Sequence, residues 1–320
     1  MQDVSLRTVF AVKNFRTLLY YKYARIENAE FFAMQHLRYC ISLGLKGRVL
    51  IADEGINGTV SGTVDQTDQY IRHLHADSRF ADMIFKIDEE DKNSFAKMHV
   101  RYKKEIVHFG VDDLDVWNHS GKYLEPNEWM KMKDEPDAVV VDFRNEVEWR
   151  VGKFKNAVTL PIKHFRDVPD HLPLLEKFRD KKILAYCTGG IRCEKATAFL
   201  IENGFKEVYH LHGGIIEYGK KAGGKDFDGK CYVFDSRITV DVNSVNPDVI
   251  SQCAYCGKPS SRFINCANDE CNNHFILCEE CGWEMDGCCS EKCRQHPQKR
   301  KYDGTGFYQK RHKQLHTELL

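Results

Sequence analysis

The sequence carries no net charge and contains no long hydrophobic run. Its 320 residues include 47 lysines and arginines against 47 aspartates and glutamates, and the pI is near 7.2. This balance excludes proteins that coat nucleic acid with most of their surface, although it is compatible with a local basic patch. No stretch approaches the ~18 uninterrupted apolar residues of a membrane span, and Arg7 and Lys13 interrupt any signal-peptide core. We therefore expect a cytoplasmic protein with neither a membrane partner nor a DNA partner.

Cysteine is scarce over most of the chain, and internal repeats and low-complexity tracts are lacking. Nine of the 13 cysteines fall between Cys253 and Cys293, and the others are Cys40, Cys187, Cys193 and Cys231. A disulfide scaffold is typical of short secreted chains, so this distribution argues against one. The short spacings of the cluster favour a metal site, and Cys187 needs a separate explanation.

The N-terminal part, residues 1–112, has the pattern of a ferredoxin-like sandwich. Strands are expected at 6–12, 48–52, 59–61, 83–87 and 98–109, with turn residues at 54–58. Helices are expected at 28–43, where Asn28 is the N-cap, and at 65–76. The order β-α-β-β-α-β is that of the ferredoxin-like fold.

The central part, residues 121–224, has the pattern of an α/β domain. Residues 137–143 form a nearly continuous β-branched run, which is typical of a strand covered on both faces. Further strands are expected at 157–160, 182–187 and 207–211, with helical stretches between them, so a parallel sheet with helices on both sides is predicted. Residues 111–120 are polar and indicate a linker, and 121–133 a short helix with Pro126 in its first turn. Residues 225–320 show little periodicity and form a small Cys-rich region.

Cys187 ends a predicted buried strand, where open α/β sheets place their sites. The next residues are Thr188, Gly189, Gly190, Ile191 and Arg192. The glycines let the backbone curl so that its N–H groups point inward, and a helix is expected from 193 to 203. The helix N-terminus, the loop amides and Arg192 all favour a negative sulfur, which lowers the thiol pKa from ~8.5 and predicts a reactive cysteine.

This loop resembles that of the rhodanese domain. The resemblance includes DFR at 142–144, EWRVGKFKNA at 148–157 and VYHLHGGI at 208–215. It implies that Cys187 takes up sulfur as a persulfide and that residues 188–191 cradle it. Phosphatases of related architecture have five residues between cysteine and arginine; the four found here favour sulfur chemistry. Asp142 and Arg144 either support the site or form a structural ion pair.

The resemblance extends to one rhodanese subgroup, the bacterial tRNA uridine(34) hydroxylases. It rests on GRVLIADEGINGTVSG at 47–62, KMHVRYKKEIV at 97–107, GKDFDGKCYVFDSR at 224–237 and the Cys-rich end. It implies that the protein uses molecular oxygen to form 5-hydroxyuridine at the wobble position of tRNA, with Cys187 as the essential residue. A persulfide sulfurtransferase and a non-catalytic RNA-binding module are the alternatives.

The route of oxygen activation is not visible in the sequence. There is no 2-His-1-carboxylate pattern and no dinucleotide fingerprint, and nothing identifies an electron donor. Cys193 is either a resolving thiol for an oxidised Cys187 or a small apolar residue in the helix.

The cysteine spacings predict two four-thiolate sites, which is the number of ligands that two tetrahedral zinc ions need. Interleaved pairs would place Cys253, Cys256, Cys278 and Cys281 in one site and Cys266, Cys271, Cys289 and Cys293 in the other. His274 is a spare ligand. Zinc would supply folding energy to a segment without a core of its own. Reduced thiols, redox disulfides and an iron–sulfur cluster are the alternatives.

Two basic stretches could bind tRNA. The first, 97–104, contains Arg101, Lys103 and Lys104, and the second, 292–313, contains Lys299, Arg300 and Lys301. Tyr302, Phe307 and Tyr308 are interleaved with the second, so its bases could contact phosphates while its rings stack. The alternative is a solvated face and a frayed tail.

Overall fold

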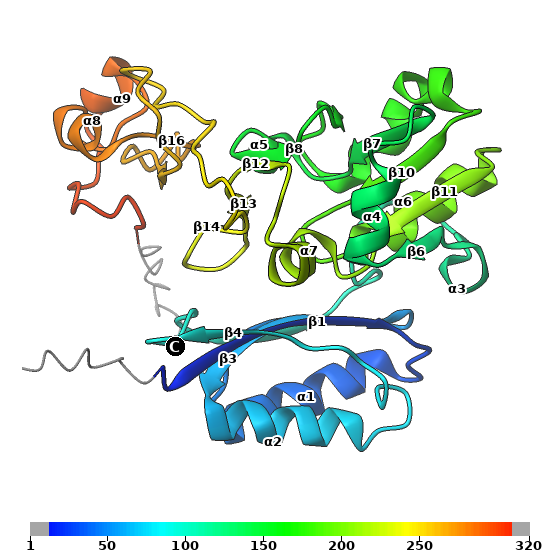
Figure 1. The fold of residues 1–320 in the computed structure, drawn as a ribbon. Helices are drawn as coiled ribbons and strands as arrows, with labels where there is room; N and C mark the ends of the chain where they lie inside the picture. Colours follow the sequence, from blue (N-terminus) through cyan, green and yellow to red (C-terminus); the bar gives the residue numbers. More distant parts are fainter. Residues whose placement is uncertain (1–12, 309–320) are drawn as a thin grey trace, which may run out of the picture.

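The first unit of the chain is a sheet covered on one face by two helices (Figure 1). The computed structural model describes residues 13–308. The elements of this unit are β1 (Phe15–Tyr23), α1 (Ala29–Ser42), β2 (Lys46–Ala52), β3 (Gly55–Thr63), α2 (Val64–His75), β4 (Lys86–Glu90) and β5 (Met98–Tyr102). The strand order is β4-β1-β3-β2-β5, antiparallel except where β5 pairs with β2. The predicted ferredoxin-like sandwich is confirmed, with β5 as an added edge strand.

Alternation along β1 gives this sheet two different faces. Leu18 and Tyr20 are buried in the core shared with α1 and α2. Leu19 and Tyr21 point to the opposite face, because successive side chains of a strand alternate. That second face is turned toward the rest of the protein (Figure 1).

Several local predictions for this unit differ from the structure. The strand expected at 6–12 lies outside the described residues. The turn expected at 54–58 is wrong beyond Glu54, because Gly55 already pairs with Ala52 in a tight hairpin. Asn28 precedes α1 with φ 52° and makes no side-chain cap. The strand expected at 98–109 ends at Tyr102, beyond which the chain crosses to the next unit.

The central unit contains a five-stranded parallel sheet in the order β6-β11-β10-β7-β9. Its strands are β6 (Lys122–Leu124), β7 (Ala138–Asp142), β9 (Val158–Thr159), β10 (Lys182–Tyr186) and β11 (Glu207–Leu211). Both faces of β10 are buried. Ile183 and Ala185 belong to the hydrophobic core on one side of the sheet, and Leu184 and Tyr186 belong to the core on the other side. Helix α6 (Ile191–Glu202) covers the first face, and α4 (Pro126–Met132) and α7 (Gly214–Ala222) cover the second. The predicted two-sided parallel sheet is confirmed.

The connections of this sheet differ from the predictions. The helix expected at 121–133 is divided into β6 and α4, with Pro126 at the helix start. The segment 111–120 is more than a linker, because Leu114 and Val116 are buried in the central core and α3 (Val116–His119) lies within it. Between β9 and β10 the chain forms three 3₁₀ turns, Phe165–Asp167, Pro169–Leu174 and Glu176–Phe178. Pro169 and Pro173 lack the N–H donors that an α-helix would need there.

The last unit begins on the central unit and ends in a small Cys-rich lobe (Figure 1). Strand β12 (Phe227–Gly229) pairs with β8 (Gly152–Phe154), which follows the short helix α5 (Glu146–Trp149). Beyond it come β13 (Cys231–Tyr232), β14 (Thr239–Val240), β15 (Phe263–Asn265), β16 (His274–Ile276), α8 (Glu279–Glu284) and α9 (Glu291–Arg294).

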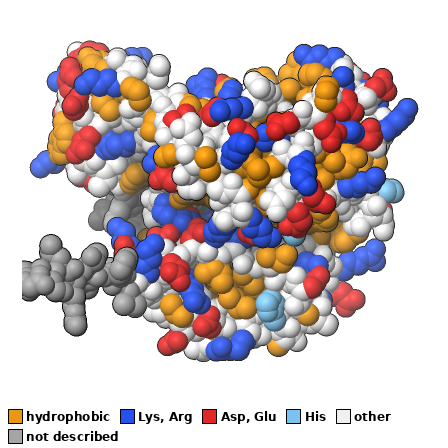
Figure 2. All heavy atoms as spheres, viewed as in Figure 1, with side chains coloured by type: hydrophobic (Ala, Val, Ile, Leu, Met, Phe, Trp, Pro, Cys, Tyr) orange, Lys and Arg blue, Asp and Glu red, His pale blue; other side chains and the backbone are white. Residues whose placement is uncertain are grey.

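The visible surface mixes charges of both signs, as expected from the balanced composition (Figure 2). Within residues 13–308, no helix has the length and apolar character needed to cross a membrane.

Candidate active site

Cys187 follows β10 directly and is completely buried at the start of a tight loop. Gly190 adopts φ 103°, a conformation that side chains rarely tolerate, and its N–H donates to Cys187 Sγ at 3.1 Å. Burial alone would raise the pKa of Cys187. The Cys193 thiol, the Arg192 guanidinium and the Gly190 amide outweigh it and lower the pKa to about 5. The sulfur is therefore a thiolate at neutral pH.

Arg192 is held in place by Glu148, a residue that our sequence analysis did not select. Arg192 Nη1 and Nη2 donate to the two carboxylate oxygens of Glu148 at 2.6 and 2.8 Å, and Nη2 also contacts Thr188 Oγ1 at 3.2 Å. Both side chains are buried. Burial raises the pKa of Glu148, but Arg192 reverses the effect and the pKa is lowered. The only sequence signal for Glu148 was its place in the rhodanese-like motif at 148–157.

Asp142 and Arg144 form a second buried pair below the loop. Arg144 Nη2 lies 2.6 Å from Asp142 Oδ2 and 2.6 Å from the carbonyl oxygen of Gly152. The Tyr186 hydroxyl donates to the same Asp142 oxygen at 2.6 Å. Because neither charged residue reaches the cavity beside Cys187, this placement favours the structural interpretation: they join β7, β8 and β10.

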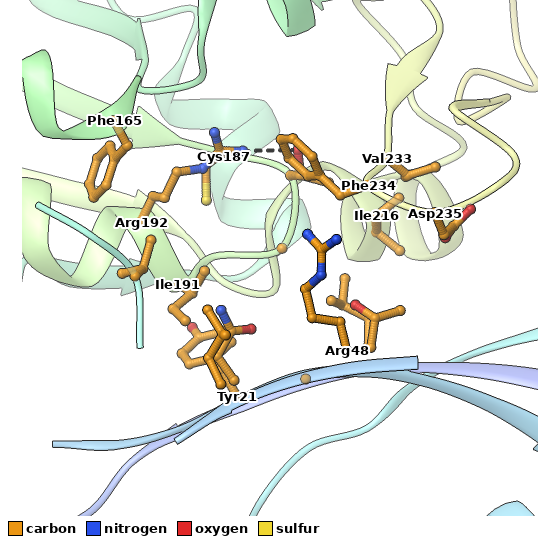
Figure 3. Close-up of a pocket in the computed structure, with 18 of the residues that line it drawn as sticks. Tyr21, Arg48, Phe165, Cys187, Ile191, Arg192, Ile216, Val233, Phe234 and Asp235 are labelled. Atoms are coloured by element: carbon orange, nitrogen blue, oxygen red, sulfur yellow. Dashed lines mark hydrogen bonds between the residues drawn. The ribbon is translucent and has the colours of Figure 1, made fainter. Parts of the chain in front are cut away.

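A cavity of about 400 Å³ opens beside Cys187, and all three units line it. Figure 3 shows Cys187 and Arg192 on one side and Arg48 rising opposite them from the N-terminal sheet toward Phe234. The second face of β1 contributes Leu19 and Tyr21. Nothing in the sequence alone indicated that this face covers the loop.

The cavity lining combines cations with aromatic rings. Its cations are Arg48, Lys86, Arg166, Arg192 and Arg237, and its phenylalanines are Phe95, Phe165 and Phe234. Arg237 is neutralised by Asp235, Asp88 and Glu90. Within the described residues, Arg48 and Arg166 form no ion pair, and the Phe234 ring is 59% exposed. Such a site is suited to an anionic ligand that carries a planar ring.

Comparisons with known proteins identify the same three units. Residues 15–106 match the UPF0176 acylphosphatase like domain, 125–221 the Rhodanese-like domain, and 228–294 the Rhodanase C-terminal family. A tRNA uridine(34) hydroxylase from Cytophaga hutchinsonii is 51% identical over 93% of this chain and 96% of its own length. The chain belongs to the tRNA uridine(34) hydroxylase family.

Other members of the family are similar over nearly as much of the chain. The Bacillus licheniformis tRNA uridine(34) hydroxylase is 49% identical over 88% of this chain and 89% of its own. That of Staphylococcus aureus is 48% identical over 90% and 92%. Among solved structures, a rhodanese-like domain protein from Staphylococcus aureus covers 30% of this chain and 90% of its own length, with 25% identity and a TM-score of 0.27.

The structure brings together the cysteines of each predicted set in this family member. The Sγ atoms of Cys253, Cys256, Cys278 and Cys281 lie within 4.8 Å of one another, as do those of Cys266, Cys271, Cys289 and Cys293. Zn–S bonds of about 2.3 Å in a tetrahedron place neighbouring sulfurs about 3.8 Å apart. Cys256 and Cys278 are 3.8 Å apart and Cys271 and Cys289 3.6 Å apart, so both sets fit such an ion. His274 instead contacts Asn265 and Tyr232.

The structure divides the six basic residues predicted to bind tRNA. Arg101, Lys103 and Lys301 are exposed and form no ion pair within residues 13–308. Lys104 pairs with Asp112 at 2.6 Å and Lys299 with Asp286 at 2.6 Å. Arg300 pairs with Asp269, contacts the carbonyl oxygen of Ala267 and stacks over Tyr308, so it holds the second cysteine set in place. The second basic stretch also contains Lys310, Arg311 and Lys313, which lie outside the described residues.

Proposed function

We propose that this protein hydroxylates uridine 34 of tRNA to 5-hydroxyuridine, with molecular oxygen as co-substrate and Cys187 as the essential residue. Membership of the tRNA uridine(34) hydroxylase family supports the reaction. The observation that carries the role of Cys187 is the Gly190 N–H that donates to its sulfur at 3.1 Å, beside a cavity lined by cations and rings. We also propose that it acts in the cytoplasm, on the tRNA that the family name specifies.

The cavity lining supports a pyrimidine nucleotide as the group that enters it. A base splayed out of a single-stranded loop is typically stacked on an aromatic side chain while cations contact its phosphates. Phe234 offers an exposed ring, and Arg48 and Arg166 offer guanidinium groups that form no ion pair within residues 13–308. In this arrangement the uracil ring lies between Phe234 and the Cys187 loop.

The Cys187 loop supplies fixed positive charge at the reacting sulfur. The Gly190 N–H and the Arg192 guanidinium stabilise a negative sulfur, whether Cys187 is present as a thiolate or as a persulfide. Cys193 is completely buried next to it, and its pKa is raised by burial and by the Cys187 thiolate. A neutral Cys193 thiol donates to the Cys187 sulfur, and the same closeness suits a resolving thiol.

A persulfide sulfurtransferase is the second candidate, and the short loop with its inward Gly190 amide favours it. Nucleoside mass spectrometry of tRNA from a deletion strain separates the two. Loss of 5-hydroxyuridine, restored by the wild-type gene, supports hydroxylation; loss of a thionucleoside supports sulfur transfer. If neither changes, a non-catalytic RNA-binding role replaces both.

We also propose that each cysteine set holds one zinc ion, through Cys253, Cys256, Cys278 and Cys281 and through Cys266, Cys271, Cys289 and Cys293. Four thiolates per ion match a closed structural site, which leaves no position for a substrate. Within the described residues the lobe contains two small buried clusters of its own, so ion binding would provide much of its folding energy. Arg101, Lys103 and Lys301 are the proposed phosphate contacts outside the cavity.

A further inference from the structure

Lys86 is a buried lysine from the N-terminal unit that contacts the Cys187 loop. It lies on β4 and is 7% exposed, and its Nζ donates to the carbonyl oxygen of Gly189 at 2.7 Å. It forms no ion pair within the described residues. A lysine buried without a carboxylate partner is costly to maintain, which indicates a role beyond packing.

The carbonyl that Lys86 holds belongs to the same peptide group that holds the reactive sulfur. The Gly189 oxygen and the Gly190 N–H lie at opposite ends of one trans peptide. At one end Lys86 binds the oxygen, and at the other the N–H donates to Cys187 Sγ at 3.1 Å. A cation on the carbonyl oxygen polarises the amide and makes its N–H a stronger donor.

This peptide would otherwise rotate easily, because glycine flanks it on both sides. The N-terminal sheet restrains it further. A Cβ atom on Gly190 would come within 2.9 Å of the Tyr21 hydroxyl, and the Lys86 ammonium lies 5.3 Å from the centre of the Tyr21 ring. Strands β1 and β4 thus hold the loop from the side opposite the parallel sheet.

We propose that Lys86 is a positioning residue that fixes the Gly189–Gly190 peptide so that its N–H stabilises the Cys187 thiolate. The reactive sulfur is then fully activated only when the N-terminal unit is docked on the central unit. This inference rests on the proposed role of Cys187 as a reactive thiol, but it does not depend on which reaction that thiol performs.

Other groups face these two side chains. Cys187 is surrounded by Arg192 and Cys193 of α6 and His210 of β11, and Lys86 by Glu194 of α6 and by Glu217 and Lys220 of α7. Burial lowers the pKa of Lys86 to about 8, while that of Cys187 is lowered to about 5. Between these values an ammonium and a thiolate coexist. Above pH ~8 the lysine becomes neutral and its hold on the peptide weakens.

The test is the pH dependence of Cys187 alkylation by iodoacetamide in the full-length protein, followed by peptide mass spectrometry. Lys86→Met should raise the apparent pKa of Cys187 by about one unit, which means roughly tenfold slower alkylation at pH values below it. Lys86→Gln keeps a neutral donor and should give a smaller shift. Lys22→Met is the matched control, because Lys22 lies nearby on β1 but pairs with the exposed Asp82.

A second variant separates activation of the sulfur from domain docking. Lys195 of α6 binds Glu54 and Glu105 of the N-terminal unit at 2.9 and 3.0 Å. Glu54→Gln weakens this contact and leaves Lys86 in place. Glu54→Gln should shift the alkylation profile less than Lys86→Met, because Lys86 itself stays bound to the Gly189 carbonyl. If Lys86→Met leaves the profile unchanged, or if the control Lys22→Met shifts it equally, the proposal is overturned. Because the measurement uses no tRNA, a failure of the hydroxylation assignment would leave this result interpretable.

Discussion

Replacing Arg192 with methionine should lower the free energy of unfolding of the central domain by about 3–5 kcal/mol, as is typical when one partner of a buried ion pair is removed. The magnitude follows from burial: the side chains of Arg192 and Glu148 are 8% and 0% exposed, and they share two short hydrogen bonds. The variant leaves the Glu148 carboxylate without its partner and also deprives the Cys187 thiolate of a neighbouring cation.

The assay is urea unfolding followed by tryptophan fluorescence. Three of the four tryptophans, Trp117, Trp129 and Trp149, lie on α3, α4 and α5 of the central unit, so they report on it. Arg150→Met is the matched control, because Arg150 pairs with Glu146 on the surface of α5 and should cost no more than about 1 kcal/mol. The double variant Arg192→Met/Glu148→Gln should regain part of the loss, since no unpaired charge is left buried.

The pH dependence of the free energy of unfolding provides a second, independent test. In the wild type the pKa of Glu148 is lowered, so its contribution is present above the ordinary carboxyl pKa and is lost as the pH falls through the folded value. Without Arg192, burial raises that pKa, and stability should then increase as the pH falls from 7 to 5. Both proteins should carry Cys187→Ser, which removes the thiolate's own pH dependence. A loss below about 1 kcal/mol for Arg192→Met, or a double variant as unstable as the single one, would refute the reasoning.

Three further outcomes are expected. Cys187→Ser should abolish 5-hydroxyuridine formation without a change in circular dichroism, because the field that ionises a thiol does not ionise a hydroxyl; retained modification in vivo would remove Cys187 from the mechanism. Elemental analysis of protein purified without chelators should find two zinc ions per chain, and chelation should unfold the Cys-rich lobe; an absence of metal together with freely titrating thiols would contradict this. Replacing Arg101, Lys103 and Lys301 with alanine should flatten the salt dependence of tRNA binding by about 0.7–0.9 log units per log unit of salt for each lost phosphate contact, whereas Arg300→Ala should destabilise the lobe instead; an unchanged slope would place the tRNA elsewhere.

The sequence predicted which helices and strands exist better than it predicted where they begin and end, for a physical reason. Most of the strands and helices in both sheets were predictable, because side-chain periodicity and turn residues are local properties of the chain. Two strands were missed, β1 at Phe15–Tyr23 and β6 at Lys122–Leu124. Element ends were less predictable: Gly55 begins a strand although it looks like a turn residue, because pairing with Ala52 determines its role. Between β9 and β10 the expected helical stretch is a series of 3₁₀ turns. Pro169 and Pro173, which disfavour an α-helix there, were already visible in the sequence.

The sequence by itself predicted the tight loop at Cys187 with its inward backbone N–H and the grouping of the eight cysteines. In both cases the relevant residues are close in the chain or paired by short spacings, so the local backbone already limits where they can lie.

Only the tertiary structure decided what surrounds the Cys187 loop. Glu148 is 44 residues from Arg192, and the Gly189 carbonyl is 103 residues from Lys86. Arg48 of the N-terminal unit and Phe234 of the last unit line the same cavity. Such contacts depend on how the second face of β1 and β4 packs on the parallel sheet, and no local pattern encodes the partner of an exposed-looking strand face. Arg300 is a further example. Its place in a basic stretch predicted RNA binding, but in the structure it pairs with Asp269 and lies over the ring of Tyr308.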